Sequence, residues 1–174
     1  MGNVMLCPNP SGLLIINDIP LESECWAIMS DLVPLWFIQR YIYPTEIHIP
    51  ADEGALPYAM DIGPATFDLN MLIIGGCNQA GSPYADPWAG LASNINAFRT
   101  DVLDPILTNN GQHAAELSVP DGSTRAANVQ VREWKPGRSF EGTVGLCVDG
   151  DGVGTKSTVH TGTLSIYVPA GIFA

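Results

Sequence analysis

The clearest hydrophobic pattern in the chain is helical and lies between Asp86 and Leu107. Apolar residues recur there at spacings of three and four, which places them on one face of a helix. These residues are Trp88, Leu91, Ile95, Phe98 and Val102. The polar residues between them are expected to face water: Ser93, Asn94, Asn96, Arg99 and Asp101.

Both ends of this helix have sequence signals. Asp86 is the expected N-cap, because its side chain can accept a free N–H group of the first turn. Pro87 follows at the first helical position, where a missing N–H costs nothing. Asp104-Pro105 is expected to end the helix, since the residue before a proline avoids the α region. We therefore predict one helix over about 87–104.

Elsewhere, apolar residues alternate or cluster in short runs that are typical of strands. The predicted strands are 13–17, 24–28, 41–49, 66–74, 114–119, 125–134, 140–148 and 158–168. Pro44 places the run 41–49 at a sheet edge or a bulge. Turns are predicted at Pro120-Asp121-Gly122 and at Lys135-Pro136-Gly137, so that the last strands form an antiparallel meander.

The remaining segments are read as connections within one domain, 1–174. They are an N-terminal arm without helix or strand (1–12), an irregular partly buried stretch (30–36), a long loop or hairpin tip (50–64) and a glycine-rich link (149–155). The expected fold is α+β and predominantly β. It is an antiparallel β-sandwich or split barrel packed by one α-helix.

Charge adds the strongest compositional signal, a formal net charge of −11 at pH 7. Residues 1–98 hold one basic and ten acidic residues, a balance of −9, and residues 99–174 hold six and eight, a balance of −2. An acidic surface repels phosphate backbones and anionic lipids, so no specific nucleic-acid binding is expected. Acidity also suits a channel wall along which DNA slides, or simply keeps the protein soluble. No apolar run approaches the roughly 18 residues of a membrane span, and no basic residue precedes Arg40 as a secretory signal would need.

Cysteine and histidine do not point to a metal or cofactor. The four cysteines, Cys7, Cys25, Cys77 and Cys147, lack CxxC spacing and are read as reduced thiols of the core or surface. The three histidines, His48, His113 and His160, are isolated and are read as strand residues. We expect no cofactor and no metal site from these residues.

Catalytic signatures are also missing, and the chain is not expected to be an enzyme. The GxSxG, HExxH and P-loop patterns are absent. The run 74–77, Ile-Gly-Gly-Cys, lacks the lysine of a phosphate loop. The pair Asp149 and Asp151 has calcium-like spacing, but Val153 and His160 stand where an EF-hand needs an oxygen ligand and a glutamate. Asp52 and Glu53 are read as solvated loop carboxylates rather than paired acids.

Tryptophans leave one binding hypothesis open. Trp26, Trp36 and Trp134 could stack on sugars if they are exposed, although core or interface positions are commoner for this residue. Trp88 lies on the apolar face of the helix and is expected in the core.

The chain resembles the minor tail proteins of long-tailed phages of actinobacteria, of the distal tail protein type. The resemblance is carried by residues spread over nearly the whole length. In the first third they are Trp26, Asp31, Leu32, Pro34, Leu35, Trp36, Arg40, Ile49, Pro50 and Gly54. In the middle they are 72–75 (Leu-Ile-Ile-Gly), Asp86, Pro87, Gly90, Leu91, Asn94, Phe98, Arg99 and Val102. Near the end they are 121–125 (Asp-Gly-Ser-Thr-Arg), 162–166 (Gly-Thr-Leu-Ser-Ile) and 168–171 (Val-Pro-Ala-Gly).

This resemblance implies a structural, non-enzymatic virion protein with the tail-tube type of fold, assembled in the bacterial host cytoplasm. It implies a hexameric ring between the tail tube and the baseplate hub or the fibre and receptor-binding proteins. Neighbouring subunits would pair strands, so that the ring has no free sheet edges. The lumen would pass the tape measure and then DNA. Two other hypotheses remain: a carbohydrate-binding β-sandwich with a row of exposed tryptophans, and a hydrolase using Asp/Glu pairs.

Overall fold

Most strands of the protein join one antiparallel sheet, which gives the predicted α+β, predominantly β fold. The structure is a computed structural model that describes residues 4–6, 9–37, 41–42, 61–148 and 151–174. The sheet runs in the order β3-β2-β8-β9-β10-β7-β4, and β1 pairs with β9 beside this path. The strands before the helix are β1 (Val4–Leu6), β2 (Leu13–Ile16), β3 (Ile19–Pro20), β4 (Trp26–Ile28) and β7 (Ala65–Ile74). Those after it are β8 (Gln112–Ser118), β9 (Thr124–Val148) and β10 (Asp151–Val168).

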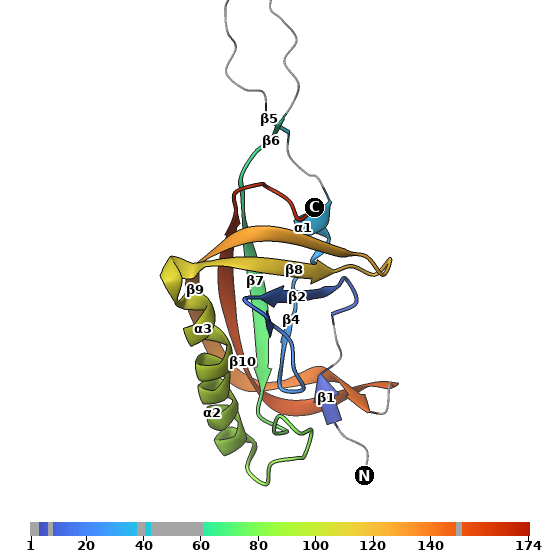
Figure 1. Ribbon diagram of the computed structural model, residues 1–174. Helices are drawn as coiled ribbons and strands as arrows, with labels where there is room; N and C mark the ends of the chain where they lie inside the picture. Colours follow the sequence, from blue (N-terminus) through green and yellow to red (C-terminus); the bar gives the residue numbers. More distant parts are fainter. Residues whose placement is uncertain (1–3, 7–8, 38–40, 43–60, 149–150) are drawn as a thin grey trace, which may run out of the picture.

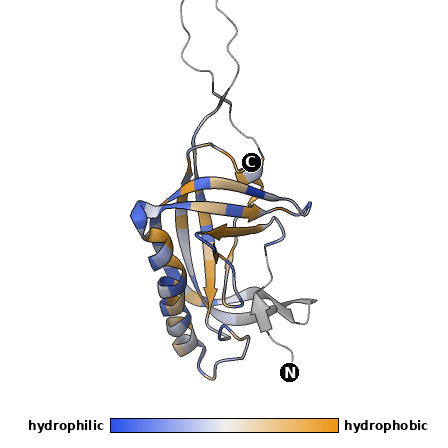
Figure 2. Cartoon of the chain, in the orientation of Figure 1, coloured by the Kyte–Doolittle hydropathy of each residue, from blue (hydrophilic) through white to orange (hydrophobic). Residues whose placement is uncertain are grey.

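The sheet curls into two layers around the core (Figure 1). β2, β8 and the first part of β9 lie in front of β4, β7 and β10. Buried and exposed side chains alternate along β2 and β8, as in a half-buried sheet. All residues of β4 and of the end of β7 are buried, and the apolar side chains of the two layers form one core (Figure 2). Fully buried members of this core include Leu14, Leu117, Leu69, Leu164 and Ile166. An antiparallel meander is present as β8, β9 and β10, but the predicted strands 125–134 and 140–148 are one strand, β9, and residues 151–155 of the predicted link belong to β10.

The predicted helix is present but continues further than its sequence signals indicate. It begins as α2 (Pro87–Phe98), passes through a π-helical segment η1 (Arg99–Leu103) and ends as α3 (Asp104–Leu107). Asp86 caps it as expected, because its Oδ1 accepts the Trp88 N–H at 3.0 Å. The predicted end at Asp104-Pro105 is wrong. The helix continues because its π-helical turn is wider than an α-helical one: the Asp104 N–H donates to the carbonyl of Arg99, five residues earlier. The wider turn accommodates Pro105, which has no N–H to donate.

The expected face of this helix is right at three of its five positions. Leu91, Phe98 and Val102 are buried and Ile95 is partly buried, but Trp88 is 47% exposed and not in the core. Asn94, expected in water, is 2% exposed.

The predicted turn at Lys135-Pro136-Gly137 is wrong, because β9 runs straight through it. His160 pairs with Ser139 and Gly162 with Pro136, so two β9 residues, Gly137 and Arg138, face one on β10. Such a bulge accepts a proline that has no N–H for the ladder. The turn at residues 120–122 is confirmed: the Gly122 N–H donates to the Val119 carbonyl at 3.0 Å, and Gly122 has a φ of +86°.

The N-terminal segment also differs from expectation. Val4–Leu6 pair with β9 in the register Val4↔Val148, so the predicted structureless arm contains a strand. Residues 30–36, expected to be irregular, contain a single helical turn, α1 (Val33–Trp36). η2 (Asn109–Gly111) is a short 3-10 turn before β8.

A second, two-stranded sheet lies apart from the main one, where β5 (Tyr41–Ile42) pairs with β6 (Asp61–Ile62). Figure 1 shows this pair beyond the end of the main sheet near α1. The pairing agrees with the start and return of a hairpin. The rest of the predicted strand 41–49, and the predicted loop 50–64 up to Met60, lie outside the described residues.

Candidate assembly surface

The second half of β9 is an open sheet edge. β8 pairs with β9 only as far as Gln130, and β1 pairs with it only from Leu146. Between them, β10 is the sole strand partner of β9 among the residues that the structure describes. We call residues 132–143 the β9 edge. Every residue of this edge is exposed except Trp134 and Gly142, which are partly buried.

Two other edges of the sheet, those of β4 and β3, are blocked by the chain itself. On β4, the Trp26 carbonyl accepts the Ser23 N–H at 2.9 Å, and the Ile28 carbonyl accepts Nδ2 of Asn9 at 3.0 Å. On β3 the edge is two residues long, and one of them is Pro20. Short edges and prolines resist pairing with other chains. The β9 edge, by contrast, is twelve residues long, and another strand can be added along it.

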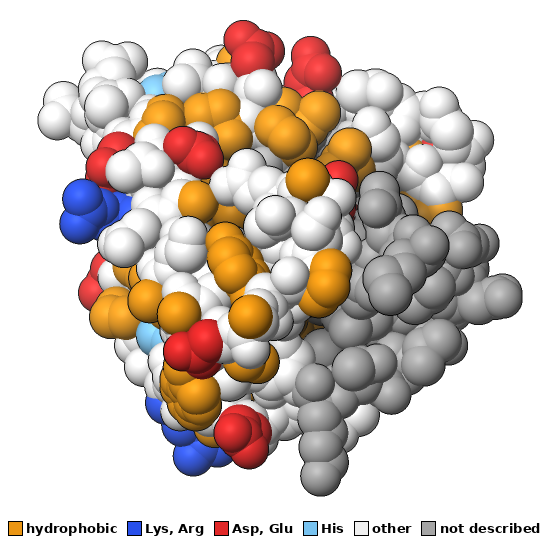
Figure 3. Space-filling model, turned by 90° about the horizontal axis from the view of Figure 1, so that it is seen from below, with side chains coloured by type: hydrophobic (Ala, Val, Ile, Leu, Met, Phe, Trp, Pro, Cys, Tyr) orange, Lys and Arg blue, Asp and Glu red, His pale blue; other side chains and the backbone are white. Residues whose placement is uncertain are grey.

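The exposed face of α2 is the second unusual surface. Between Leu69 and Phe98, Asp86 is the only charged residue of the sequence. The exposed residues of the helix and of the loop before it are small, apolar or amide side chains: Pro83, Ala85, Pro87, Trp88, Ala89, Ala92, Ser93 and Asn96. Figure 3 views the molecule from below, the end where this helix begins, and shows apolar side chains spread over that face with several acidic side chains among them. Depletion of charge is the compositional mark of a protein interface.

The helix is held tightly against the sheet behind this face. A Cβ on Gly75 would lie 2.1 Å from the Pro87 carbonyl oxygen, and one on Gly90 would lie 2.3 Å from that of Gly75. Nδ2 of the buried Asn94 donates to the carbonyls of Ile74 and Cys77, both at 2.7 Å. The Gly-Gly run that faintly suggests a phosphate loop is thus a close crossing of helix and strand, not an open anion cradle.

Aromatic side chains join the helix to the sheet interior. The Phe98 ring lies 5.5 Å from that of Trp26 and 5.3 Å from that of Trp134, between centroids. Trp26 is buried, and Trp36 and Trp134 pack partly buried against the core. The tryptophans therefore form no exposed row, and the sugar-stacking use predicted for Trp26, Trp36 and Trp134 lacks the surface it needs.

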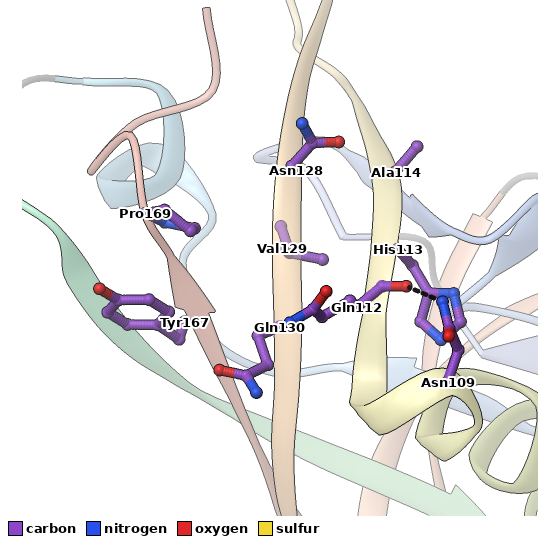
Figure 4. Close-up of a pocket in the computed structure, with 9 residues that line it drawn as sticks. All are labelled: Asn109, Gln112, His113, Ala114, Asn128, Val129, Gln130, Tyr167 and Pro169. Carbon is purple, nitrogen blue, oxygen red and sulfur yellow. Dashed lines mark hydrogen bonds between the residues drawn. The ribbon is translucent and has the colours of Figure 1, made fainter.

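A shallow pocket lies on the outer face of the meander (Figure 4). It has a volume of about 490 Å³. Gln112, Gln130 and Tyr167 cross β8, β9 and β10 in one row, since Gln130 pairs with both of the others. Asn109 and Asn128 flank that row. The sequence pattern predicts the strands here, but it does not show which residues of neighbouring strands pair. The pocket is therefore not predicted from the sequence.

The cysteines and histidines do not form a reactive group. Cys25 and Cys77 are buried, and the Cys25 thiol donates to the Cys77 carbonyl at 3.3 Å. The adjoining Cys77 thiol and burial raise the pKa of the Cys25 thiol far above its ordinary value, so it stays protonated. His160 Nδ1 lies 2.9 Å from Ser139 Oγ, and burial lowers the pKa of His160. No group of three or more metal-ligating side chains occurs among the described residues.

The remaining candidate residues lie outside the described residues, or in strands at positions whose side chains are not described. Cys7, His48, Asp52, Glu53 and Asp149 lie outside the described residues. Cys147 and Asp151 lie in β9 and β10, but their side chains are not described. No helix in the described parts of the chain has the length and apolar character that a membrane crossing requires.

Comparisons with known proteins give no family assignment: no family model, no curated protein and no solved structure matches this chain.

Proposed function

We propose that this protein is a structural subunit of a phage tail tip, of the distal tail protein kind, that assembles into a ring of about six copies. The observation that carries the proposal is the β9 edge. A twelve-residue exposed edge, in a sheet whose β3 and β4 edges are blocked by Pro20, Asn9 and Ser23, offers a site for strand addition. Addition of a neighbour's strand at one surface generates a closed ring when the rotation closes.

Three further features support this role. The fold is predominantly β with one packed helix, as the resemblance implies. The uncharged face of α2 offers a second contact, either to a neighbouring subunit or to the protein stacked on the ring. The net charge of −11 suits a lumen along which DNA moves without sticking. In this role the ring links the tail tube to the baseplate and fibre proteins, and no residue has a catalytic task.

The β9 edge itself limits unwanted pairing. Lys135, Pro136 and Arg138 lie in its middle at the bulge, where charge, a missing N–H and a bend interrupt the ladder. Prolines, lysines and bulges at an edge hinder indiscriminate aggregation. Two short stretches, 132–134 and 139–143, are left for pairing, and only a strand with a matching bend fits both.

Mass photometry at low micromolar concentration, combined with hydrogen exchange, tests the proposal. We expect a species near six copies whose 132–143 amides exchange more slowly than in the dilute monomer. Ala92→Lys places a charge on the exposed α2 face, at a helical site that tolerates lysine, and is expected to weaken assembly. Glu116→Lys, an exposed change on β8, is the matched control and should assemble normally.

A chain that stays monomeric, alone and when mixed with the tail tube and baseplate proteins, would contradict the ring. Assembly with unprotected 132–143 amides would contradict the β9 edge as its interface.

A further inference from the structure

The pocket on the outer face of β8, β9 and β10 is the feature that the structural role leaves unused. We propose that it binds a neutral saccharide, so that the protein carries a glycan contact besides its place in the tail. The proposal does not depend on ring formation.

The pocket is built by the fold rather than left by a mobile surface. Asn109, Asn110 and Gly111 all have left-handed backbone, with φ of 52°, 56° and 68°. A Cβ on Gly111 would lie 2.0 Å from the Val131 carbonyl oxygen, so this turn is seated directly on β9. Nδ2 of Asn109 donates to the Gln112 carbonyl at 3.4 Å, as Figure 4 shows. Consecutive left-handed residues outside glycine store strain that often coincides with binding sites.

The lining has the chemistry of a hydroxyl-rich, uncharged ligand. Asn109, Gln112, Asn128 and Gln130 each carry a carboxamide, which both donates and accepts hydrogen bonds, as a sugar hydroxyl does. The Tyr167 ring and Pro169 supply apolar surface of the kind that packs on sugar C–H groups. The pocket lining contains no carboxylate, so a metal cation finds no counter-charge in it.

A buried polar atom of the lining and a charged side chain outside it lie close to the pocket. Nε2 of the partly buried His113 has no hydrogen-bond partner among the described residues. Outside the lining, the Arg132 guanidinium carbon lies 3.9 Å from the centroid of the Tyr167 ring, which fixes the orientation of that ring. The volume of about 490 Å³ falls in the range of small-ligand sites, roughly 300–1,000 Å³.

Saturation-transfer NMR on the full-length protein tests the proposal with four neutral trisaccharides, of glucose, mannose, arabinose and N-acetylglucosamine. Inositol hexakisphosphate and an uncharged hexapeptide serve as the probes of other ligand classes. We expect transfer to at least one trisaccharide at millimolar concentration. Chemical shifts should move for the side-chain amides of Gln112, Asn128 and Gln130.

Variants separate this pocket from the rest of the surface. Gln130→Ala and Tyr167→Ala should each weaken binding by about tenfold, the effect of one lost hydrogen bond or stacking contact. Tyr167→Phe keeps the ring and should retain most of the affinity. Gln79→Ala removes an exposed amide from another loop and should change nothing. Binding of the hexapeptide or the phosphate alone, saccharide binding that ignores Gln130→Ala in a folded variant, or no saccharide binding at all would overturn the proposal.

Discussion

Asn94 shows how one buried amide can decide the stability of the whole helix–sheet junction. Its Nδ2 donates to the carbonyls of Ile74 and Cys77, and the Cys77 carbonyl also accepts the Cys25 thiol. We expect Asn94→Ala to lower the free energy of unfolding by about 2–4 kcal/mol, because it removes two hydrogen bonds to buried carbonyls. Urea unfolding followed by tryptophan fluorescence measures the change. Asn96→Ala, on the exposed side of the same helix, is the control and should be neutral or slightly stabilising.

The folded protein favours the protonated, neutral form of the Glu22 side chain. Burial raises its pKa above the ordinary value of 4.5, although N–H groups of Asn9 and Ile28 oppose the shift. A raised carboxyl pKa means that the unfolded chain loses its proton first as the pH rises. The stability that Glu22 contributes is therefore full below pH 4.5 and is lost as the pH rises through its folded pKa.

Glu22→Gln removes this ionisation and keeps an oxygen for the Asn9 N–H. We expect a small rise in melting temperature at pH 7 and none at pH 4, since the wild-type side chain is protonated there. Thermal unfolding at the two pH values measures the difference. An equal effect at both would show that packing, not charge, sets the change. Glu116→Gln, at an exposed site, is the control.

At the scale of elements, Gly90 reverses an ordinary helix rule. Replacing glycine by alanine inside a helix normally stabilises it by about 1 kcal/mol. Here the new Cβ would lie 2.3 Å from the Gly75 carbonyl oxygen and 2.4 Å from the Tyr84 ring. We expect Gly90→Ala to destabilise the protein by about 1–3 kcal/mol, the usual cost of overpacking. Chemical denaturation of the variant tests the sign, and a stabilised protein would refute the close crossing.

Sequence periodicity predicts the helices and strands that are long and half-buried. It does not predict where they end, or which polar residues of the apolar face are buried by a hydrogen bond to another element. β7 and the first part of the helix were predictable because one apolar face repeats over ten or more residues. The prediction for Asn94 is wrong because its partners are carbonyls at the end of β7 and in the loop after it, seventeen to twenty residues away. Pro105 and Pro136 were read as stops, since a π-turn and a bulge that absorb a proline depend on tertiary packing.

The sequence predicts the candidate surfaces only in part. The uncharged stretch between Leu69 and Phe98 is visible in the sequence, but its exposure is not. The β9 edge requires knowledge of where β8 ends and β1 begins, which is a property of the register. The amide row depends in the same way on Gln130 facing Gln112 and Tyr167.

For the whole molecule, the net negative charge opposes the association of subunits that the proposed interfaces favour. Each copy carries −11, whereas the surfaces proposed to join copies are a backbone ladder and the uncharged face of α2. Ring formation therefore brings negatively charged subunits close together, and the proposed contacts contain no ion pairs that would offset their repulsion. Electrostatic repulsion between subunits should oppose assembly, and its range is set by salt: the screening length is about 30 Å at 0.01 M and about 10 Å at 0.1 M.

We expect assembly to strengthen as sodium chloride rises from about 10 mM to about 300 mM, which screens the repulsion. Light scattering coupled to size-exclusion chromatography, at one protein concentration, follows the fraction of ring. Lowering the pH toward the sequence pI of about 4.3 at low salt should act in the same direction, since it reduces the net charge. An interface made of complementary charges would behave in the opposite way and dissociate as salt is added. That outcome would show that charged side chains of the β9 edge, such as Lys135 and Arg138, pair across the contact.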